Sequence, residues 1–354
     1  MKKSLITLAV SAVLATPFSV SAVEVAGEKL NVYGKIHVSI DNSNQDDPAV
    51  TNDGISVSSN SSRLGFKGKI PLDNGMKVIW QAEQEVRWDD GSKGNFANRN
   101  SYVGLASGAH SFRVGVYDTP FKVVASKWGV FGDSVGERRA MLGASYSDNN
   151  KLNQRPDNVM MYQFKNDSLK FQAMYAVDPE DQKTGSIDDN DRSVLSTGVW
   201  WKLDNINLSA AYSDWKKHSK MGDGTTLRVA ATIGLGSHQI GAIFEDITPD
   251  VTNSWDRSAY GVNWKWKFAS KTDIRAQYIV VDDAKNQIDT GATKIALGLF
   301  HKLDKSAEVY LAYGATDNEA NAQFQAVDGG HGDEVKTVNG GSPSSISAGL
   351  VYKF

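Results

Sequence analysis

The side chains able to do chemistry in this sequence are scattered rather than gathered into a catalytic or metal-binding motif. Cysteine is absent, which excludes a disulfide frame and a thiolate nucleophile. Six histidines stand far apart, without the His-Glu-x-x-His spacing of a zinc site. No Gly-x-Ser-x-Gly elbow is present, and Gly234-Leu-Gly236 lacks the third glycine of a dinucleotide loop. We therefore expect no enzyme, no metal and no cofactor.

Charged side chains alternate with uncharged ones along many short segments. Between residues 260 and 268 the even positions are all apolar or aromatic, whereas Lys265 and Lys267 occupy the other parity. The same segregation surrounds Lys77, Lys170 and Arg228. A repeat of two is that of a β-strand with one apolar face.

This alternation, bounded by turn residues, predicts sixteen strands. They span residues 29–42, 58–70, 75–89, 97–107, 110–117, 156–165, 168–178, 192–203, 205–217, 224–235, 237–248, 255–269, 271–283, 291–303, 305–316 and 344–354.

The connections between these strands alternate in length. Seven are short turns and eight are longer polar stretches, of which 118–155 is the longest. Short turns on one rim and long loops on the other are typical of outer-membrane barrels. We predict an all-β, sixteen-stranded antiparallel transmembrane barrel of up-and-down topology.

The segregation of charge indicates which solvent each face meets. An arginine at the bilayer midplane costs roughly 2 to 4 kcal/mol, so the charge-free faces suit lipid. An interior lined by Lys, Arg and Glu must hold water. Aromatic residues near strand ends are candidates for interfacial girdles, although strand propensity alone could account for them. They are Trp88, Phe164, Trp201, Trp215, Trp255, Phe268 and Phe354.

The N-terminus predicts export. A basic Met1-Lys-Lys start, an apolar run from Leu5 to Ala15 and small residues up to Ala22 are typical of a signal peptide. We therefore expect a signal peptide at 1–22 and a barrel domain at 23–354; a single membrane anchor is the alternative. The net charge of −3 becomes about −5 without Lys2 and Lys3, which argues against a nucleic-acid partner.

Several segments, in order along the mature chain, resemble the general diffusion porins of Gram-negative bacteria. They are Leu30-Asn-Val-Tyr-Gly-Lys35, Ser62-Arg-Leu-Gly-Phe-Lys-Gly68, Arg99-Asn-Ser-Tyr-Val-Gly-Leu105, Asp118-Thr-Pro120, Arg155-Pro-Asp-Asn-Val-Met-Met-Tyr162, Lys271-Thr-Asp-Ile-Arg-Ala-Gln-Tyr278 and Gly349-Leu-Val-Tyr-Lys-Phe354. The resemblance implies a homotrimer in the bacterial outer membrane, surrounded by lipid and lipopolysaccharide. It also implies passive diffusion of small hydrophilic solutes and ions, with the third long loop folded into the lumen.

For individual residues the resemblance implies a pore constriction between a basic and an acidic wall. The basic ladder matches Lys35, Arg63, Arg99 and Arg155. Strand alternation places each of them opposite apolar or aromatic neighbours, with Tyr102 opposite Arg99, and therefore toward the lumen. The candidate acids, all in the third loop, are Asp118, Asp133 and Glu137. Opposed charges across a wet gap would create a transverse field, whereas an ordinary solvated loop is the alternative.

Two features depart from the family pattern. Val116 stands where relatives often carry a basic residue, and Arg113 is the candidate to replace it. Arg138 and Arg139 add positive charge to the loop expected to be acidic. The sign of ion selectivity therefore stays open, and a channel preferring an oligosaccharide or an anion is the alternative function. A barrel enzyme is a remote one.

The last strand, residues 344–354, has an apolar face that ends at Phe354. We expect it to close the barrel against residues 29–42. The aromatic terminus also resembles the assembly signal that the barrel-insertion machinery reads in this family.

Overall fold

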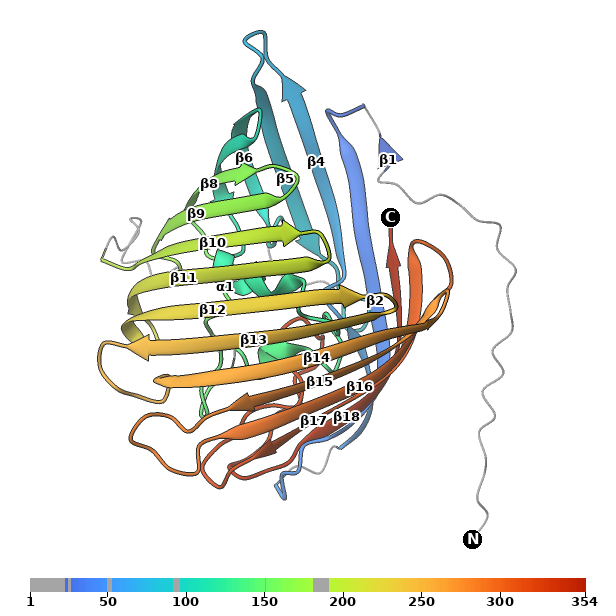
Figure 1. Ribbon diagram of the computed structural model, residues 1–354, viewed down its shortest axis with the longest axis vertical. Coiled ribbons are helices and arrows are strands. Elements are labelled where there is room, and N and C mark those ends of the chain that lie inside the picture. Colours follow the sequence, from blue (N-terminus) through green and yellow to red (C-terminus); the bar gives the residue numbers. More distant parts are fainter. Residues whose placement is uncertain (1–22, 25–26, 50–52, 92–95, 150, 181–190) are drawn as a thin grey trace.

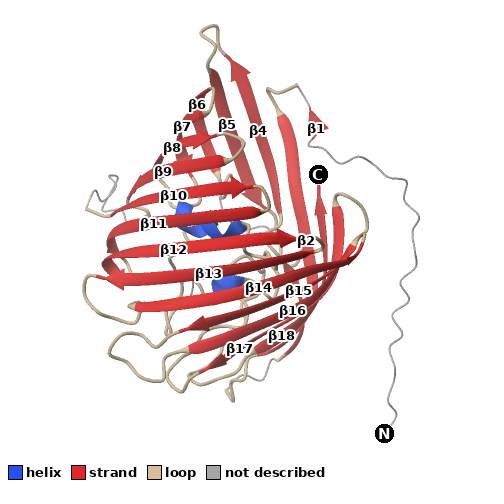
Figure 2. Cartoon of the chain, viewed as in Figure 1, coloured by secondary structure: helices blue, strands red, loops and turns tan. Residues whose placement is uncertain are grey.

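The computed structural model describes residues 23–24, 27–49, 53–91, 96–149, 151–180 and 191–354. The predicted signal peptide lies outside these residues. Within the described part of the chain, sixteen antiparallel strands form a closed barrel (Figures 1 and 2). A short strand, β1 (Val23–Glu24), pairs with the start of β2.

Each barrel strand pairs with the next one along the chain, which is the predicted up-and-down topology. The strands are β2 (Asn31–Asn44), β3 (Gly54–Ser59) with β4 (Arg63–Pro71) as two pieces of one strand, β5 (Lys77–Glu85), β6 (Ser101–Ser107), β7 (His110–Val116), β8 (Val159–Lys165), β9 (Leu169–Val177), β10 (Ser193–Leu203), β11 (Ile206–His218), β12 (Gly222–Leu235), β13 (His238–Pro249), β14 (Arg257–Ala269), β15 (Thr272–Val281), β16 (Ala292–Lys302), β17 (Ala307–Asn318) and β18 (Ser344–Lys353).

The last strand closes the barrel against the first, as predicted. β18 pairs with β2 over ten residues, from Ser344 opposite Asn44 to Lys353 opposite Lys35. The amide of Phe354 then donates to the carbonyl of Gly34, at 3.1 Å. Closure leaves no sheet edge with unpaired backbone groups, which a bilayer would not tolerate.

The second strand differs from its prediction, because β3 lies partly inside the segment 43–57 that the sequence assigned to a loop. β3 pairs with residues 38–43 of β2, and β4 pairs with residues 31–35. Between them Ser61 has a positive φ of 50°, and the Ser62 hydroxyl donates to the His37 carbonyl at 3.0 Å. This bulge interrupts the alternation on which the prediction depended.

The charge-free parity faces outward, as the alternation predicted. Val262 and Leu297 are 54% exposed on the outer surface, whereas Arg228 and Lys294 are fully buried inside. The girdle prediction was wrong for Trp215 and Trp255. Both side chains are buried in the apolar cluster inside the barrel, close to His218.

Residues 117–158, the connection between β7 and β8, fold back into the barrel. They contain α1 (Pro120–Val123) and the short 3-10 helices η1 (Val124–Ser126) and η2 (Arg138–Ala140), which lie within the ring of strands in Figures 1 and 2. No described helix is long and apolar enough to cross a membrane. We call residues 117–158 loop 3.

Loop 3 folds inward because it carries large apolar side chains that need burial. Phe121 and Trp128 are fully buried, and Phe131 is 2% exposed. The wall beneath the loop presents small residues: a Cβ at Gly241 or Gly261 would overlap the Trp128 ring. Burying one such aromatic side chain contributes roughly 1.5 to 3 kcal/mol.

The connection between β17 and β18, residues 319–343, also turns inward. Phe324 and Val327 are buried, and the Gly332 amide donates to Asn60 Oδ1 at 2.8 Å. His331 Nε2 lies 3.3 Å from Asp41 Oδ2 of β2. This second inward loop was not predicted, and it brings residues 328–334 to the lumen.

Candidate functional site

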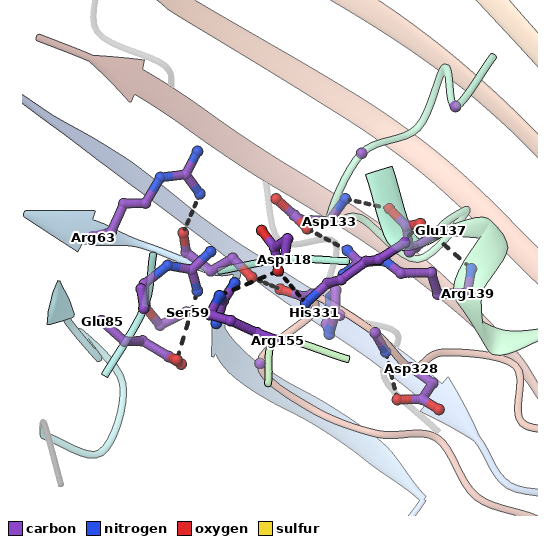
Figure 3. A pocket seen from close by; sticks show the side chains of 18 of the residues that line it. Ser59, Arg63, Glu85, Asp118, Asp133, Glu137, Arg139, Arg155, Asp328 and His331 are labelled. Atoms are coloured by element: carbon purple, nitrogen blue, oxygen red, sulfur yellow. Dashed lines mark hydrogen bonds and ion pairs between the residues drawn. The ribbon is translucent and has the colours of Figure 1, made fainter. Parts of the chain in front are cut away.

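A cavity of about 610 Å³ lies inside the barrel, bounded by loop 3, the inner wall at β4 and β5, and residues 328–334 (Figure 3). Most of its lining is charged. It contains seven Lys or Arg and eight Asp or Glu among the described residues, so opposite charges nearly balance.

The four residues of the predicted basic ladder lie at or beside this cavity. Arg63, Arg99 and Arg155 line it, and Lys35 reaches its edge from β2. Arg63 begins β4, whereas Arg99 and Arg155 stand shortly before β6 and β8.

Strand alternation was the wrong reason for placing Arg99 inward. Tyr102, expected on the outer face, also points into the lumen, where the Arg113 guanidinium lies 4.7 Å from its ring centre. Arg99 precedes the strand and does not follow its parity. Its amide instead donates to the Glu83 carbonyl at 3.0 Å, and its guanidinium meets the Glu83 carboxylate on the inner wall.

The three candidate acids of loop 3 line the same cavity, and two of them contact the ladder directly. Lys35 Nζ lies 2.6 Å from Asp133 Oδ2. Arg155 Nε lies 3.2 Å from Asp118 Oδ1. The structure therefore joins the two predicted walls at these points instead of leaving a gap between them.

The other two ladder cations pair with acids on β5. Arg99 Nε lies 2.9 Å from Glu83 Oε1, and Arg63 Nε lies 3.5 Å from Glu83 Oε2. Glu85 is 3.7 Å from Arg99 Nη1. The sequence analysis did not select these two glutamates. Both glutamates occupy the alternate, charged positions of the strand next to Arg63, and this pattern could have identified them in the sequence.

Loop 3 also carries cations that pair with its own acids. Arg139 bridges Asp133 at 2.7 Å and Glu137 at 3.1 Å. Arg138 Nη1 lies 3.0 Å from Glu137 Oε1. The two arginines noted as departures are therefore partners of the predicted acids, and they explain how buried carboxylates stay ionised.

Lys122 is a further lumen cation that the sequence analysis missed. Its Nζ lies 2.8 Å from Oδ1 of Asp118, which stands four residues earlier, just before α1. Burial lowers the pKa of Lys122 to about 8, although neighbouring Asp118 acts to raise that pKa. Burial acts to raise the pKa of Asp118, but the charges of Lys122 and Arg155 outweigh it and hold this pKa well below its usual range.

Inward polar side chains of the wall hold loop 3 by its main-chain carbonyls. Asn263 Nδ2 donates to the Trp128 carbonyl at 2.6 Å, and Arg275 Nη1 donates to that of Val130 at 2.9 Å. Further donors to loop carbonyls are Ser209 to Val124, Arg228 to Phe121, Arg257 to Met141 and Ala144, Gln277 to Gly136, and Lys294 to Val135.

Glu245 of β13 organises several of these anchors. Its fully buried carboxylate accepts from Arg228 Nε at 2.7 Å and from the Gly143 amide of loop 3 at 2.8 Å. Arg257 Nη2 lies 3.2 Å from the same carboxylate.

Arg113 does not replace the basic residue that is missing at Val116. It faces the lumen from β7 but lines a different cavity, nearer the β6–β7 turn. Phe354, the predicted assembly residue, lies outside both cavities, and a Cβ added to Gly34 would overlap its ring.

The fold and the inward loop agree with comparisons to known proteins. The model of the Gram-negative porin family matches residues 9–321. The chain belongs to this family. The porin is 26% identical to outer membrane porin protein 32 of Delftia acidovorans over 324 residues, 88% of each chain. It is 33% identical to the major outer membrane protein P.IB of Neisseria meningitidis serogroup B over 127 residues, 34% of this chain and 35% of the relative.

Two solved structures show the same fold. The anion-selective porin from Comamonas acidovorans has a TM-score of 0.73 at 20% identity, covering 92% of this porin and 99% of that chain. The trimer form of OmpT from Vibrio cholerae has a TM-score of 0.66 at 20% identity, with the same coverage. As a member of the Gram-negative porin family, the protein forms a channel across the Gram-negative outer membrane, and it is not an enzyme.

Proposed function

We propose that this porin mediates passive diffusion of small hydrophilic solutes and ions, and that its pore constriction lies between loop 3 and the ladder of Lys35, Arg63, Arg99 and Arg155. The observation that carries the proposal is the ion-paired lining of the central cavity. Charged groups fixed on both sides of a wet passage attract ions and dipolar solutes, while apolar solutes gain nothing for the hydration they lose.

The near balance of charges in the lining supports passage of ions of both signs. Each ladder cation has a carboxylate within 4 Å, so the net field of the constriction is weaker than the number of arginines suggests. Of the alternatives, two observations favour a channel that prefers anions. One is the similar porin described as anion-selective, and the other is the set of cations that lines the second cavity, near the β6–β7 turn.

Reversal potentials in a salt gradient test the constriction. Replacing Arg63, Arg99 and Arg155 together by Ala leaves Glu83, Glu85 and Asp118 without these partners. We expect the permeability ratio to shift toward cations by roughly tenfold, because a few fixed charges change local ion concentrations on this order.

The matched control replaces three exposed lysines by Ala and should leave the ratio unchanged; they are Lys216 near the end of β11 and Lys285 and Lys336 in loops. An unaltered ratio in the arginine variant would exclude these side chains from the constriction. A purified porin that never conducts in a planar bilayer would contradict the diffusion function itself.

Association into a homotrimer within the lipid and lipopolysaccharide of the outer membrane is also part of the proposal. The apolar outer surface and the trimeric relative OmpT support it. The mass of the detergent-solubilised porin in analytical ultracentrifugation distinguishes a trimer from a monomer. Export by the signal peptide at 1–22 predicts a mature chain beginning at Val23, which N-terminal sequencing checks.

A further inference from the structure

A second cavity, of about 600 Å³, lies at the turn-side mouth of the barrel. Its lining includes Gly108 and Ala109 of the β6–β7 turn, so it is separate from the ladder. Lys67 and Lys69 of β4, Arg113 of β7 and Lys165 of β8 contribute cations to it. Lys165 stands directly opposite Lys170 of β9 in the strand register. We call these five residues the vestibule cluster.

The vestibule cluster differs from the ladder in its partners. Among the residues that the structure describes, none of the five has a carboxylate within ion-pair distance; Glu28 also lines this cavity, but its carboxylate lies 3.9 Å from Lys77 Nζ. Three of the five cations lie against aromatic rings instead. Lys67 Nζ lies 4.6 Å from the centre of the Tyr33 ring, and Lys170 Nζ lies 3.3 Å from that of Trp200.

Arg113 is held between two rings. Its guanidinium lies 4.7 Å from the Tyr102 centroid and 5.2 Å from the Tyr117 centroid. A ring attracts a cation through its quadrupole and carries no net charge, so it stabilises the cation without neutralising it. The positive charge of the vestibule cluster therefore remains available to a solute, in contrast to that of the ladder.

Arg113 also has unused hydrogen-bonding capacity. It is only 6% exposed, Nη2 donates to Ser111 Oγ at 3.1 Å, and Nε has no hydrogen-bond partner. A buried donor without an acceptor is unfavourable, and a bound oxyanion would remove that cost.

We propose that the vestibule cluster binds small solutes that carry two separated oxyanion groups, and that it favours the entry of such anions into the channel. The proposal rests on the diffusion function proposed above. Lys165 and Lys170 stand opposite each other on β8 and β9, whereas Arg113 of β7 pairs with Met161, four residues and therefore about 13 Å along β8 from Lys165. A dianion with separated charges can contact two of these cations at once, whereas a compact or singly charged anion contacts fewer.

Calorimetry on the detergent-solubilised porin tests this site without needing a current. The probes are glutarate, with two separated carboxylates, sulfate as a compact dianion, and acetate as a monoanion. We expect glutarate to bind more tightly than sulfate, and sulfate more tightly than acetate. Sulfate binding as tightly as glutarate, or acetate as tightly as either, would overturn the proposal.

The test variant is K67Q/K165Q/K170Q, which leaves buried Arg113 in place. Its glutarate affinity should fall roughly tenfold, as expected for the loss of several solvent-accessible charge pairs. The control variant K216Q/K285Q/K336Q makes the same change in net charge at exposed positions outside the vestibule cluster and should bind as the unmodified porin does. Equal affinity in the test variant, an equal loss in the control, or no binding of glutarate would overturn the proposal.

Single-channel recordings of the same preparations separate the two proposals. A porin that conducts without binding glutarate retains its diffusion function and has no vestibule site. A porin that binds glutarate with this variant pattern but does not conduct has the site and lacks the diffusion function.

Discussion

Single side chains in the lumen act through their neighbours, because the charges that surround loop 3 form connected groups of ion pairs. Lys35, Asp133 and Arg139 form a continuous series that continues through Glu137 to Arg138. Removing one charge therefore changes the field felt at several others. Replacement of one arginine would expose its carboxylate partner as well as delete a positive charge.

The pKa of Lys122 predicts a pH-dependent selectivity. With a pKa of about 8, Lys122 is charged at pH 7 and neutral at pH 9, while Asp118 stays ionised throughout. The lumen therefore loses one positive charge as pH rises, and the ratio of anion to cation permeability should fall.

Reversal potentials at pH 7, 8 and 9 measure this change. A Lys122→Met variant should show the high-pH ratio at all three values, whereas Lys336→Met, at an exposed loop position, should behave as the unmodified porin does. A ratio that stays constant in the unmodified porin would show that Lys122 does not titrate in this range.

The sequence identified the ladder and the loop acids, but it could not identify their partners. Alternation places Lys35 correctly because it lies inside a regular strand. Arg99 and Arg155 lie outside strands, so only the family resemblance indicated them. Which cation meets which acid depends on how loop 3 is seated, and that depends on contacts between residues more than a hundred positions apart.

Among the elements, loop 3 depends on the wall more than on its own helices. Its helical segments are three or four residues long and could not persist alone. Apolar burial and donors from β11 to β16 hold it instead. Phe121, Trp128 and Phe131 were a visible clue to this burial, because a loop exposed to water has no need for such residues.

Replacing Glu245 by Ala should loosen loop 3. The substitution leaves Arg228 and Arg257 buried without their carboxylate, which costs roughly 3 to 5 kcal/mol. We expect a lower thermal unfolding temperature and larger, noisier single-channel currents, as the Gly143 anchor is lost too. Asp246→Ala, at the next position on the opposite face of β13, is the control and should change neither quantity. Quiet currents of normal size in the Glu245 variant would mean that loop 3 is held without this carboxylate.

Strand positions were predictable to within a few residues, since lipid outside and water inside enforce the alternation along each strand. The bulge between β3 and β4 was not predictable, because it depends on the Ser62 hydroxyl meeting the His37 carbonyl of a neighbouring strand. Trp215 and Trp255 point inward because they are buried around His218. A tryptophan near a strand end does not show by its residue type whether it faces the lipid or the lumen.

For the molecule as a whole, the pairing that closes the barrel between β18 and β2 ends at a contact between Phe354 and Gly34. Deleting Phe354, or replacing Gly34 by Val, removes or blocks this contact on the outer face. We expect a lower yield of folded trimer, with normal conductance in the molecules that do assemble.

Heat-modifiable migration on gels measures the folded fraction, and planar bilayers measure conductance. Phe268→Ala removes another exposed aromatic side chain near a turn and should leave the yield unchanged. Normal trimer yield without Phe354 would count against its role as an assembly signal.

The anchoring of loop 3 through main-chain carbonyls separates two properties of the channel. Every residue type has a carbonyl, so substitutions at many loop positions preserve the bonds from Asn263, Arg275 and Gln277. The seating of the loop is therefore encoded largely in the barrel wall, while the loop side chains can change the charge that they add to that of Arg63, Glu83 and Glu85 on the wall. Selection can then retune which solutes pass without rebuilding the frame that sets the width of the opening.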